Sequence, residues 1–243
     1  MGKHDDSAEA QAVHERYARR TPNDARYSLL DPAALLAAQE RQRAMLRLFA
    51  RVGCTDLAAL RLLEVGCGGG GNLLELLRMG FVPEHLCGIE LLPERFAQAR
   101  RVLPSALALI EGDALQAEVP PQSQDIVLAA TVFSSLLDDA FQQRLADAMW
   151  RWVKPGGAVL WYDFTFDNPR NADVRGVPLA RVRSLFPHGQ VQARRITLAP
   201  PIARAVCGAH PALYGVFNAL PMLRTHVLAW IVKGAGAERS SLR

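Results

Sequence analysis

The chain is poor in cysteine, and the few cysteines offer no metal site. The four are Cys54, Cys67, Cys87 and Cys207. They form no C-x-x-C pair. Their apolar or turn surroundings suit free thiols in a reducing compartment. No zinc site is therefore expected.

Long apolar runs and a strong excess of one charge are also missing. No apolar run approaches the ~20 residues that span a bilayer, and the first ten residues are polar and charged. Lysine and arginine number 28 against 24 acidic residues. The resulting net charge of +4 favours a solvated surface over nucleic-acid binding. We therefore expect a cytoplasmic protein with no nucleic-acid partner.

A glycine cluster after an apolar strand organises the middle of the chain. Leu62–Val65 predicts a buried strand, and a helix is predicted from Asn72. Between them, Gly66, Gly68 and Gly70 permit backbone angles and a close ligand approach that a side chain would forbid. Such a loop lies at the carboxyl end of a strand, where open α/β sheets bind ligands. The adjoining helix N-terminus favours anionic groups.

The glycine spacing alone leaves the cofactor open, because positions 66, 68 and 71 also satisfy the dinucleotide-binding pattern. Glu64 precedes the first glycine by two residues and completes the string Glu-x-Gly-x-Gly-x-Gly. This string resembles motif I of the class I S-adenosylmethionine (SAM)-dependent methyltransferases, in which the acid lies near the cofactor's amino group. Glu90 ends the second predicted strand, Leu86–Leu91, where a carboxylate reaches ribose hydroxyls. NAD enzymes share that device, so Glu90 indicates a nucleoside cofactor of either kind.

Two later segments strengthen the resemblance. Glu111-Gly112-Asp113-Ala114 resembles the element whose Asp accepts a hydrogen bond from the adenine amino group in these methyltransferases. Lys154-Pro155-Gly156-Gly157 resembles the turn before the family's fifth strand. The resemblance implies SAM as cofactor, and the residues expected to bind it are Glu64, Gly66, Gly68, Gly70, Glu90, Leu91, Asp113, Ala114 and Thr131.

The resemblance also implies the fold, a three-layer Rossmann-like α/β arrangement with a seven-stranded mixed sheet and an antiparallel strand seven. Residues 56–243 would form the SAM-binding domain, with 202–223 as a cap insertion. Residues 1–55 would form an N-terminal arm and helix that serve as a lid. The first 30 residues read as a mobile arm, and a disordered tail is the alternative for residues 1–15. Asp31-Pro32 predicts the start of the helix that follows.

The chain after the fifth strand would lie over the site and supply the methyl acceptor's pocket. Residues 163–176 mix aromatics, amides, acids and arginines, as a polar-substrate pocket needs, although turn formers on a surface would look similar. His226, at the start of the last strand, and Asp163 are the candidate general bases, because an alcohol hydroxyl benefits from one. His226 could instead be structural. The expected substrate contacts are Tyr27, Arg170, Asn171, Arg175 and Tyr214.

Two segments, Asn168–Gly176 and Leu223–His226, resemble parts of methyltransferases encoded among bacterial surface-polysaccharide genes. That likeness implies O-methylation of a glycan or other polyol. The apolar run 216–223 also admits a lipid-linked acceptor and peripheral membrane contact. No metal is expected, because residues 129–134 at the end of strand four carry no carboxylate. The oligomeric state is left open.

Three alternative functions remain. A natural-product or other small-molecule O- or N-methyltransferase would have the same cofactor half. A NAD-dependent oxidoreductase would need a Tyr-x-x-x-Lys or similar partner, which the sequence lacks. A non-catalytic binding module would be expected to have lost Glu64 or Glu90, and both are present.

Overall fold

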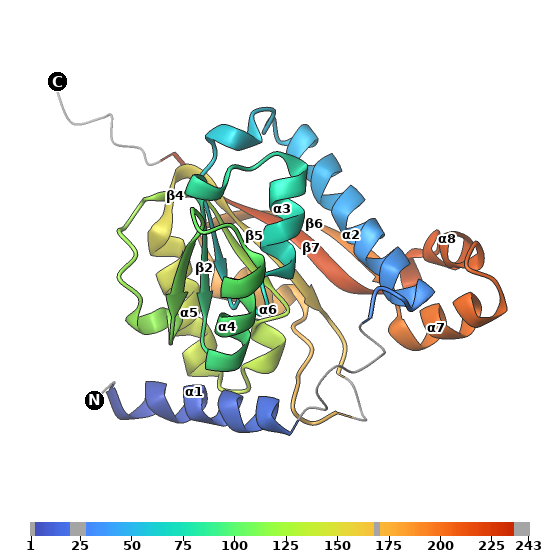
Figure 1. The fold of residues 1–243 in the computed structure, drawn as a ribbon, viewed down its shortest axis with the longest axis horizontal. Helices are drawn as coiled ribbons and strands as arrows, with labels where there is room; N and C mark the ends of the chain where they lie inside the picture. The colour runs from blue at the N-terminus through green and yellow to red at the C-terminus, as the bar shows by residue number, and fades with distance from the viewer. Residues whose placement is uncertain (1–2, 20–27, 168–170, 236–243) are drawn as a thin grey trace.

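The protein is described by a computed structural model that covers residues 3–19, 28–167 and 171–235. A seven-stranded sheet with the order β3-β2-β1-β4-β5-β7-β6 forms its centre, and helices cover both faces (Figure 1). The strands are β1 (Leu62–Val65), β2 (Leu86–Glu90), β3 (Ala108–Glu111), β4 (Gln124–Ala130), β5 (Val153–Phe164), β6 (Gly189–Leu198) and β7 (Arg224–Lys233). β7 runs antiparallel to both of its neighbours, β5 and β6. The predicted mixed sheet with an antiparallel strand seven is confirmed.

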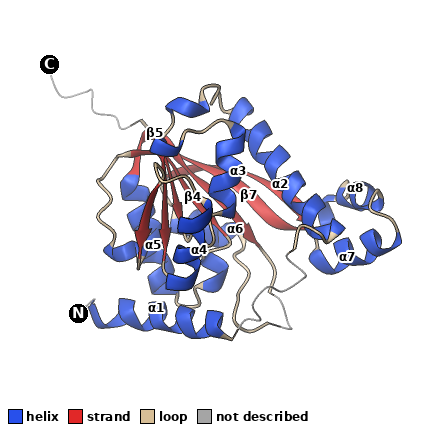
Figure 2. Cartoon of the chain, viewed as in Figure 1, coloured by secondary structure: helices blue, strands red, loops and turns tan. Residues whose placement is uncertain are grey.

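The helices pack as two layers on opposite faces of the sheet (Figure 2). Apolar side chains of α2, α3 and α4 share one core cluster, and those of α5 and α6 share another. The helices are α1 (Lys3–Ala18), α2 (Pro32–Arg51), α3 (Gly71–Met79), α4 (Pro93–Val102), α5 (Asp139–Trp152), α6 (Leu179–Leu185), α7 (Pro200–Ala209) and α8 (Leu213–Asn218). β1 is buried at every position, as expected of a parallel strand that is covered on both faces. The three-layer prediction is thus confirmed.

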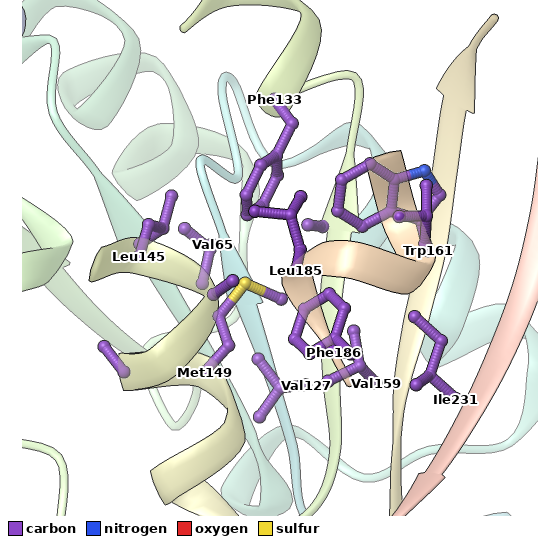
Figure 3. Packing of buried hydrophobic residues seen from close by; sticks show 14 of the residues in the cluster. Val65, Val127, Phe133, Leu145, Met149, Val159, Trp161, Leu185, Phe186 and Ile231 are labelled. Carbon is purple, nitrogen blue, oxygen red and sulfur yellow. The ribbon is translucent and has the colours of Figure 1, made fainter. Parts of the chain in front are cut away.

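The core on the α5 side is rich in aromatic rings and fixes the turn after β4. Figure 3 shows Phe133, Trp161, Phe186 and Met149 in one apolar cluster. The ring centroids of Phe133 and Trp161 are 4.5 Å apart. Phe133 begins a short 3-10 helix, η5 (Phe133–Ser135), and its side chain is fully buried. Aromatic packing of this kind holds η5 rigidly beside the carboxyl end of β4.

The N-terminal segment differs from the prediction of a mobile arm, because Lys3–Ala18 forms the helix α1. Figure 1 shows α1 lying across one end of the sheet. Ala10, Val13 and Tyr17 recur at intervals of three and four residues and form a narrow apolar stripe among charged residues. Val13 is buried in the core cluster on the α5 side. Residues 1–30 are otherwise mostly polar, and three apolar residues are too few to indicate a packed helix. The sequence alone therefore predicted an arm.

Candidate cofactor and acceptor site

The loop after β1 adopts a conformation that only glycine takes without strain. Gly66 and Gly68 have φ angles of +64° and +58°, in the left-handed region. A Cβ added at Gly66 would lie 2.8 Å from Cγ2 of Val132, closer than such carbons approach. The loop therefore presents bare backbone at the carboxyl end of β1, as motif I requires.

Glu90 joins the ends of β1 and β2. One of its carboxylate oxygens accepts a hydrogen bond from the Gly68 backbone N–H at 2.6 Å, and the other accepts from Leu92 N–H at 2.9 Å. The side chain is buried, yet it lines the cavity described below. Each oxygen keeps a second lone pair for a ligand hydroxyl. Glu90 thus fixes the glycine loop and remains able to bind a ribose.

Glu64 is a fully buried carboxyl group with one satisfied oxygen. Its Oε1 accepts a hydrogen bond from Nδ2 of Asn72 at 2.6 Å, whereas Oε2 has no partner within the described part of the chain. Burial raises the pKa of Glu64 to about 7, against the lowering effect of the Asn72 hydrogen bond. A buried, orphaned carboxylate oxygen is costly unless a donor satisfies it. The α-ammonium group of SAM is a donor of the required charge, so the residues present fit this cofactor.

A cavity of about 110 Å³ lies at the carboxyl ends of β1, β2 and β4. Six of the nine residues expected to bind the cofactor line it: Gly66, Glu90, Leu91, Asp113, Ala114 and Thr131. The other three, Glu64, Gly68 and Gly70, belong to β1 and the adjoining loop. Asp113 also caps a short 3-10 helix, η4 (Ala114–Gln116), by accepting a hydrogen bond from Leu115 N–H at 2.9 Å. The structure therefore brings together the residues that the motifs indicated.

α1 covers this cavity, and it belongs to the segment 1–55 that was predicted to act as a lid. Ala10, Val13 and Tyr17 contribute to the lining, and the guanidinium carbon of Arg95 lies 4.8 Å from the centre of the Tyr17 ring. Pockets that hold cofactors usually enclose ≈ 300–1,000 Å³, well above the volume found here. The cavity under α1 is therefore smaller than those that usually hold a cofactor.

A buried ion pair anchors α1. Arg16 Nη2 donates to Glu9 Oε1 at 2.6 Å and to the carbonyl oxygen of Ser135 at 3.0 Å. Glu9 Oε1 in turn accepts from Leu137 N–H at 2.8 Å. Both charged side chains are about nine-tenths buried. The anchor ties α1 to η5 and to the residues that follow it.

The two candidate bases lie on opposite faces of the sheet. Side chains alternate along β5, so that Asp163 shares the α5 side with Trp161, while His226 stacks on Tyr162 on the α2 side. The carboxylate of Asp163 accepts hydrogen bonds from the backbone N–H groups of Ser134 and Phe164, at 3.0 and 2.9 Å. Burial raises its pKa to about 7. The hydrogen bond from Ser134 shows that the Asp163 carboxylate helps to fix the position of η5.

His226 occupies an aromatic and largely buried position. Its ring centroid is 5.0 Å from that of Tyr162, nearly parallel to it, and Nδ1 lies 3.1 Å from Thr225 Oγ1. The pKa of His226 is lowered to about 4, first by burial and then by the nearby positive charge of Arg41. The imidazole is therefore neutral at physiological pH and able to accept a proton.

The predicted acceptor residues do not form one group. Arg175 lines a second cavity of about 460 Å³ beside α5 and forms an ion pair with Asp139. Asn171 lies in the loop before it, where Oδ1 accepts from Asp173 N–H at 3.0 Å. Tyr214 is buried and donates to Oε2 of Glu40 at 3.0 Å. The other two predicted contacts, Tyr27 and Arg170, lie outside the described residues.

Two negative findings apply to residues 3–19, 28–167 and 171–235. Within these ranges no group of three or more His, Cys, Asp or Glu side chains could hold a metal ion. In the same ranges no helix is both long enough and apolar enough to cross a membrane.

Comparisons with known proteins agree with this geometry. Residues 62–157 match the family described as methyltransferase domain. The chain is 30% identical to trans-aconitate 2-methyltransferase of Azoarcus sp. (strain BH72), over 65% of its own length and 62% of the relative's. It is 34% identical to the fatty-acid O-methyltransferase of Mycolicibacterium smegmatis, over 44% of its own length and 38% of that relative's. The chain thus spans less than two thirds of these relatives.

The fold is shared with solved structures. An S-adenosylmethionine-dependent methyltransferase from Mesorhizobium loti superposes with a TM-score of 0.56 and 15% identity, covering 79% of this chain and 95% of the other. The fold is that of the class I SAM-dependent methyltransferases. Residues 62–157 belong to the methyltransferase domain family, and SAM is the cofactor of this site.

Proposed function

We propose that the protein transfers a methyl group from SAM to a small acceptor. The orphaned Oε2 of Glu64 beside the glycine loop is the observation that carries the proposal. Bound SAM supplies a methyl group on a positively charged sulfur, which is already electrophilic. The protein then has to bind and orient the cofactor and the acceptor and to exclude water, because in-line displacement depends on alignment. Glu64, Glu90 and Asp113 would hold the two ends and the ribose of the cofactor.

For the acceptor, we propose a hydroxyl of a glycan or another polyol. The polar side chains of residues 163–176, which include and follow the carboxyl end of β5, support a polar acceptor. A lipid or lipid-linked acceptor is the second candidate. Three apolar side chains of the 202–223 segment are exposed to solvent, namely Val216, Leu220 and Met222. In addition, part of the chain is similar in sequence to a fatty-acid O-methyltransferase. Metal-independent catalysis and a cytoplasmic location stay predictions.

Calorimetry with S-adenosylhomocysteine, SAM and NADH tests the cofactor. We expect both adenosyl ligands to bind tightly and NADH to bind at least tenfold more weakly, because a nicotinamide dinucleotide has no ammonium group to pair with Glu64. NADH binding as tight as that of S-adenosylhomocysteine would overturn the proposal. Release of S-adenosylhomocysteine in the presence of simple glycosides or of fatty acids then separates the two acceptor classes.

We propose His226, rather than Asp163, as the base that takes the acceptor's proton. His226 shares a face with Glu64, and Asp163 already accepts two backbone hydrogen bonds. His226→Ala should lower kcat by roughly 100-fold, the range for loss of a general base, and leave the Kd for S-adenosylhomocysteine unchanged. Because the pKa of His226 is about 4, the wild-type kcat should not titrate with this group above about pH 5.

The best acceptor from the glycoside and fatty-acid panel serves for this measurement. Thr225→Val removes the hydroxyl next to the ring without removing the ring, and it is the matched control. Wild-type turnover by His226→Ala would show that the imidazole is structural.

A further inference from the structure

The α7–α8 segment (residues 200–223) has an outer side that is almost wholly apolar. Figure 1 shows α7 and α8 together at one end of the molecule. The exposed residues of the segment are alanine, glycine, proline, valine, leucine and methionine, apart from Arg204 and His210. Apolar surface gathered on one segment in this way indicates contact with another protein or with a membrane. The larger exposed side chains are Val216, Leu220 and Met222.

The inner side of the segment packs against α2 and fixes the segment's orientation. Ala203 and Cys207 of α7 share a small core with Ala33 of α2. Tyr214 of α8 donates to Oε2 of Glu40, which also lies on α2, at 3.0 Å. The opposite side of the segment, which carries the exposed apolar side chains, is therefore held facing solvent.

The charges of this part of the chain have one sign. Residues 174–235 contain no aspartate or glutamate. Of the carboxylates near α7 and α8, that of Glu40 is bound by Tyr214, and that of Asp31 caps α2. The net charge around the segment is therefore positive. The basic residues of the range 174–235 are Arg175, Arg181, Arg183, Arg194, Arg195, Arg204, Arg224 and Lys233.

Exposed arginines lie beside the apolar side chains. Arg204 is exposed on α7 itself, and Arg195 is exposed on β6, the edge strand of the sheet. The carbonyl oxygen of Arg195 accepts a hydrogen bond from Nη1 of Arg224 at 3.2 Å. Nε of Arg224 donates to the carbonyl oxygen of Asn218, the last residue of α8, at 2.7 Å. Arg195 is thus held next to the end of α8, where residues 219–222 are exposed.

This combination of apolar and basic groups matches one kind of partner better than the others. In a two-fold dimer the same face would meet itself, so that arginines would oppose arginines without an acid to pair with. A nucleic acid would attract the arginines and leave the apolar side chains in water. An anionic membrane uses both, because its headgroups attract basic residues and its interface buries apolar ones.

We propose that the α7–α8 segment docks on an anionic phospholipid membrane. Val216, Leu220 and Met222 insert among the headgroups, and Arg195 and Arg204 contact the lipid phosphates. β7 begins directly after the segment, so that docking holds the start of this strand close to the lipid surface. The proposal goes beyond methyl transfer and does not depend on which acceptor the protein uses.

Co-sedimentation with vesicles tests the docking. Each arginine near an anionic surface strengthens binding about fivefold, so vesicles of phosphatidylcholine and phosphatidylglycerol, mixed about two to one, should bind the wild type roughly tenfold or more tightly than phosphatidylcholine alone. Val216→Ser/Met222→Ser removes two apolar side chains that the membrane buries, and it should weaken binding to the mixed vesicles by roughly tenfold or more. Arg204→Gln should weaken it about fivefold and reduce its dependence on salt.

The matched controls are Val102→Ser and Arg101→Gln, because both residues are exposed on α4. They should bind the mixed vesicles as the wild type does, and all four variants should unfold at the wild-type temperature. Failure of the wild type to bind the mixed vesicles, or equal binding to both compositions, would overturn the proposal without any variant.

Two further outcomes would also contradict the docking. Wild-type vesicle binding by Val216→Ser/Met222→Ser would show that the segment does not reach the membrane. A wild-type dimer in sedimentation velocity that this double variant dissociates would assign the surface to a second copy of the chain. Calorimetry with S-adenosylhomocysteine tests the proposed function separately, since none of these substitutions lies at the glycine loop.

Discussion

Glu64→Gln is expected to weaken binding of S-adenosylhomocysteine by at least 30-fold at pH 7.5. Removing one member of a buried charge pair costs about 2–5 kcal/mol, and Glu64 is completely buried beside the loop that receives the cofactor. Glutamine keeps the shape of the side chain and its bond with Asn72. It loses the charge that the α-ammonium requires. Isothermal titration calorimetry measures the change directly.

The same variant should lose a pH dependence. The carboxyl of Glu64 has a pKa of about 7, raised by burial, so it is mostly protonated at pH 6 and mostly charged at pH 8. Wild-type affinity should therefore rise between pH 6 and 7.5, and that of Glu64→Gln should stay flat. The free energy of unfolding should change in the opposite sense. A carboxyl group whose pKa is raised by folding stabilises the fold below its unfolded pKa, and this contribution is lost as the pH rises towards 7.

Glu111→Gln is the matched control, because Glu111 also ends a parallel strand but is exposed. It should bind S-adenosylhomocysteine as the wild type does at every pH. If Glu64→Gln bound within twofold of the wild type at pH 7.5, Glu64 would have no role in holding the ammonium group.

Arg16→Met should detach α1 from the body of the protein. The substitution leaves the carboxylate of Glu9 buried without its cation, and breaking such a pair costs about 3–5 kcal/mol. Hydrogen exchange of backbone amides in residues 8–18 should become more than 100-fold faster. Binding of S-adenosylhomocysteine should also become faster, because α1 covers the cavity that would receive it.

The chain contains a suitable comparison for this experiment. Arg19 pairs with Asp173 at 2.6 Å, but the arginine side chain is 58% exposed. Exposed pairs are worth about 0–1 kcal/mol, so Arg19→Met should accelerate exchange only slightly. Equal exchange rates in the two variants would mean that the Glu9 pair does not hold α1.

Local sequence signals were enough to predict that Gly66, Glu90 and Asp113 lie around one cavity. The strands before these residues are recognisable from their apolar runs. The sequence next to Gly66, Glu90 and Asp113 was therefore enough to place each of them at the end of a strand. The carboxyl ends of parallel strands meet at one edge of a sheet, so that the order of the motifs was sufficient to predict which of these residues line one cavity.

Residues whose roles depend on tertiary packing could not be predicted in this way. α2 contains Arg41, Arg43, Arg47 and Arg51, and no local pattern distinguishes the one that reaches the sheet. Asp163 and His226 were grouped as bases because the end of strand five and the start of strand seven were both expected to face the site. The register pairs His226 with Phe164, so that Asp163 points to the other face. α1 likewise depends on a three-residue stripe and on one buried ion pair.

The α7–α8 segment has a small core of its own, distinct from the two clusters on the faces of the sheet. Its buried members are Ala33, Leu198, Ala203, Cys207 and Tyr214. Val216 and Met222 lie on its outer surface, 64% and 77% exposed. Substitutions there remove few contacts and leave the glycine loop untouched. A library of variants confined to these outer positions should therefore leave the affinity for S-adenosylhomocysteine unchanged, which calorimetry measures.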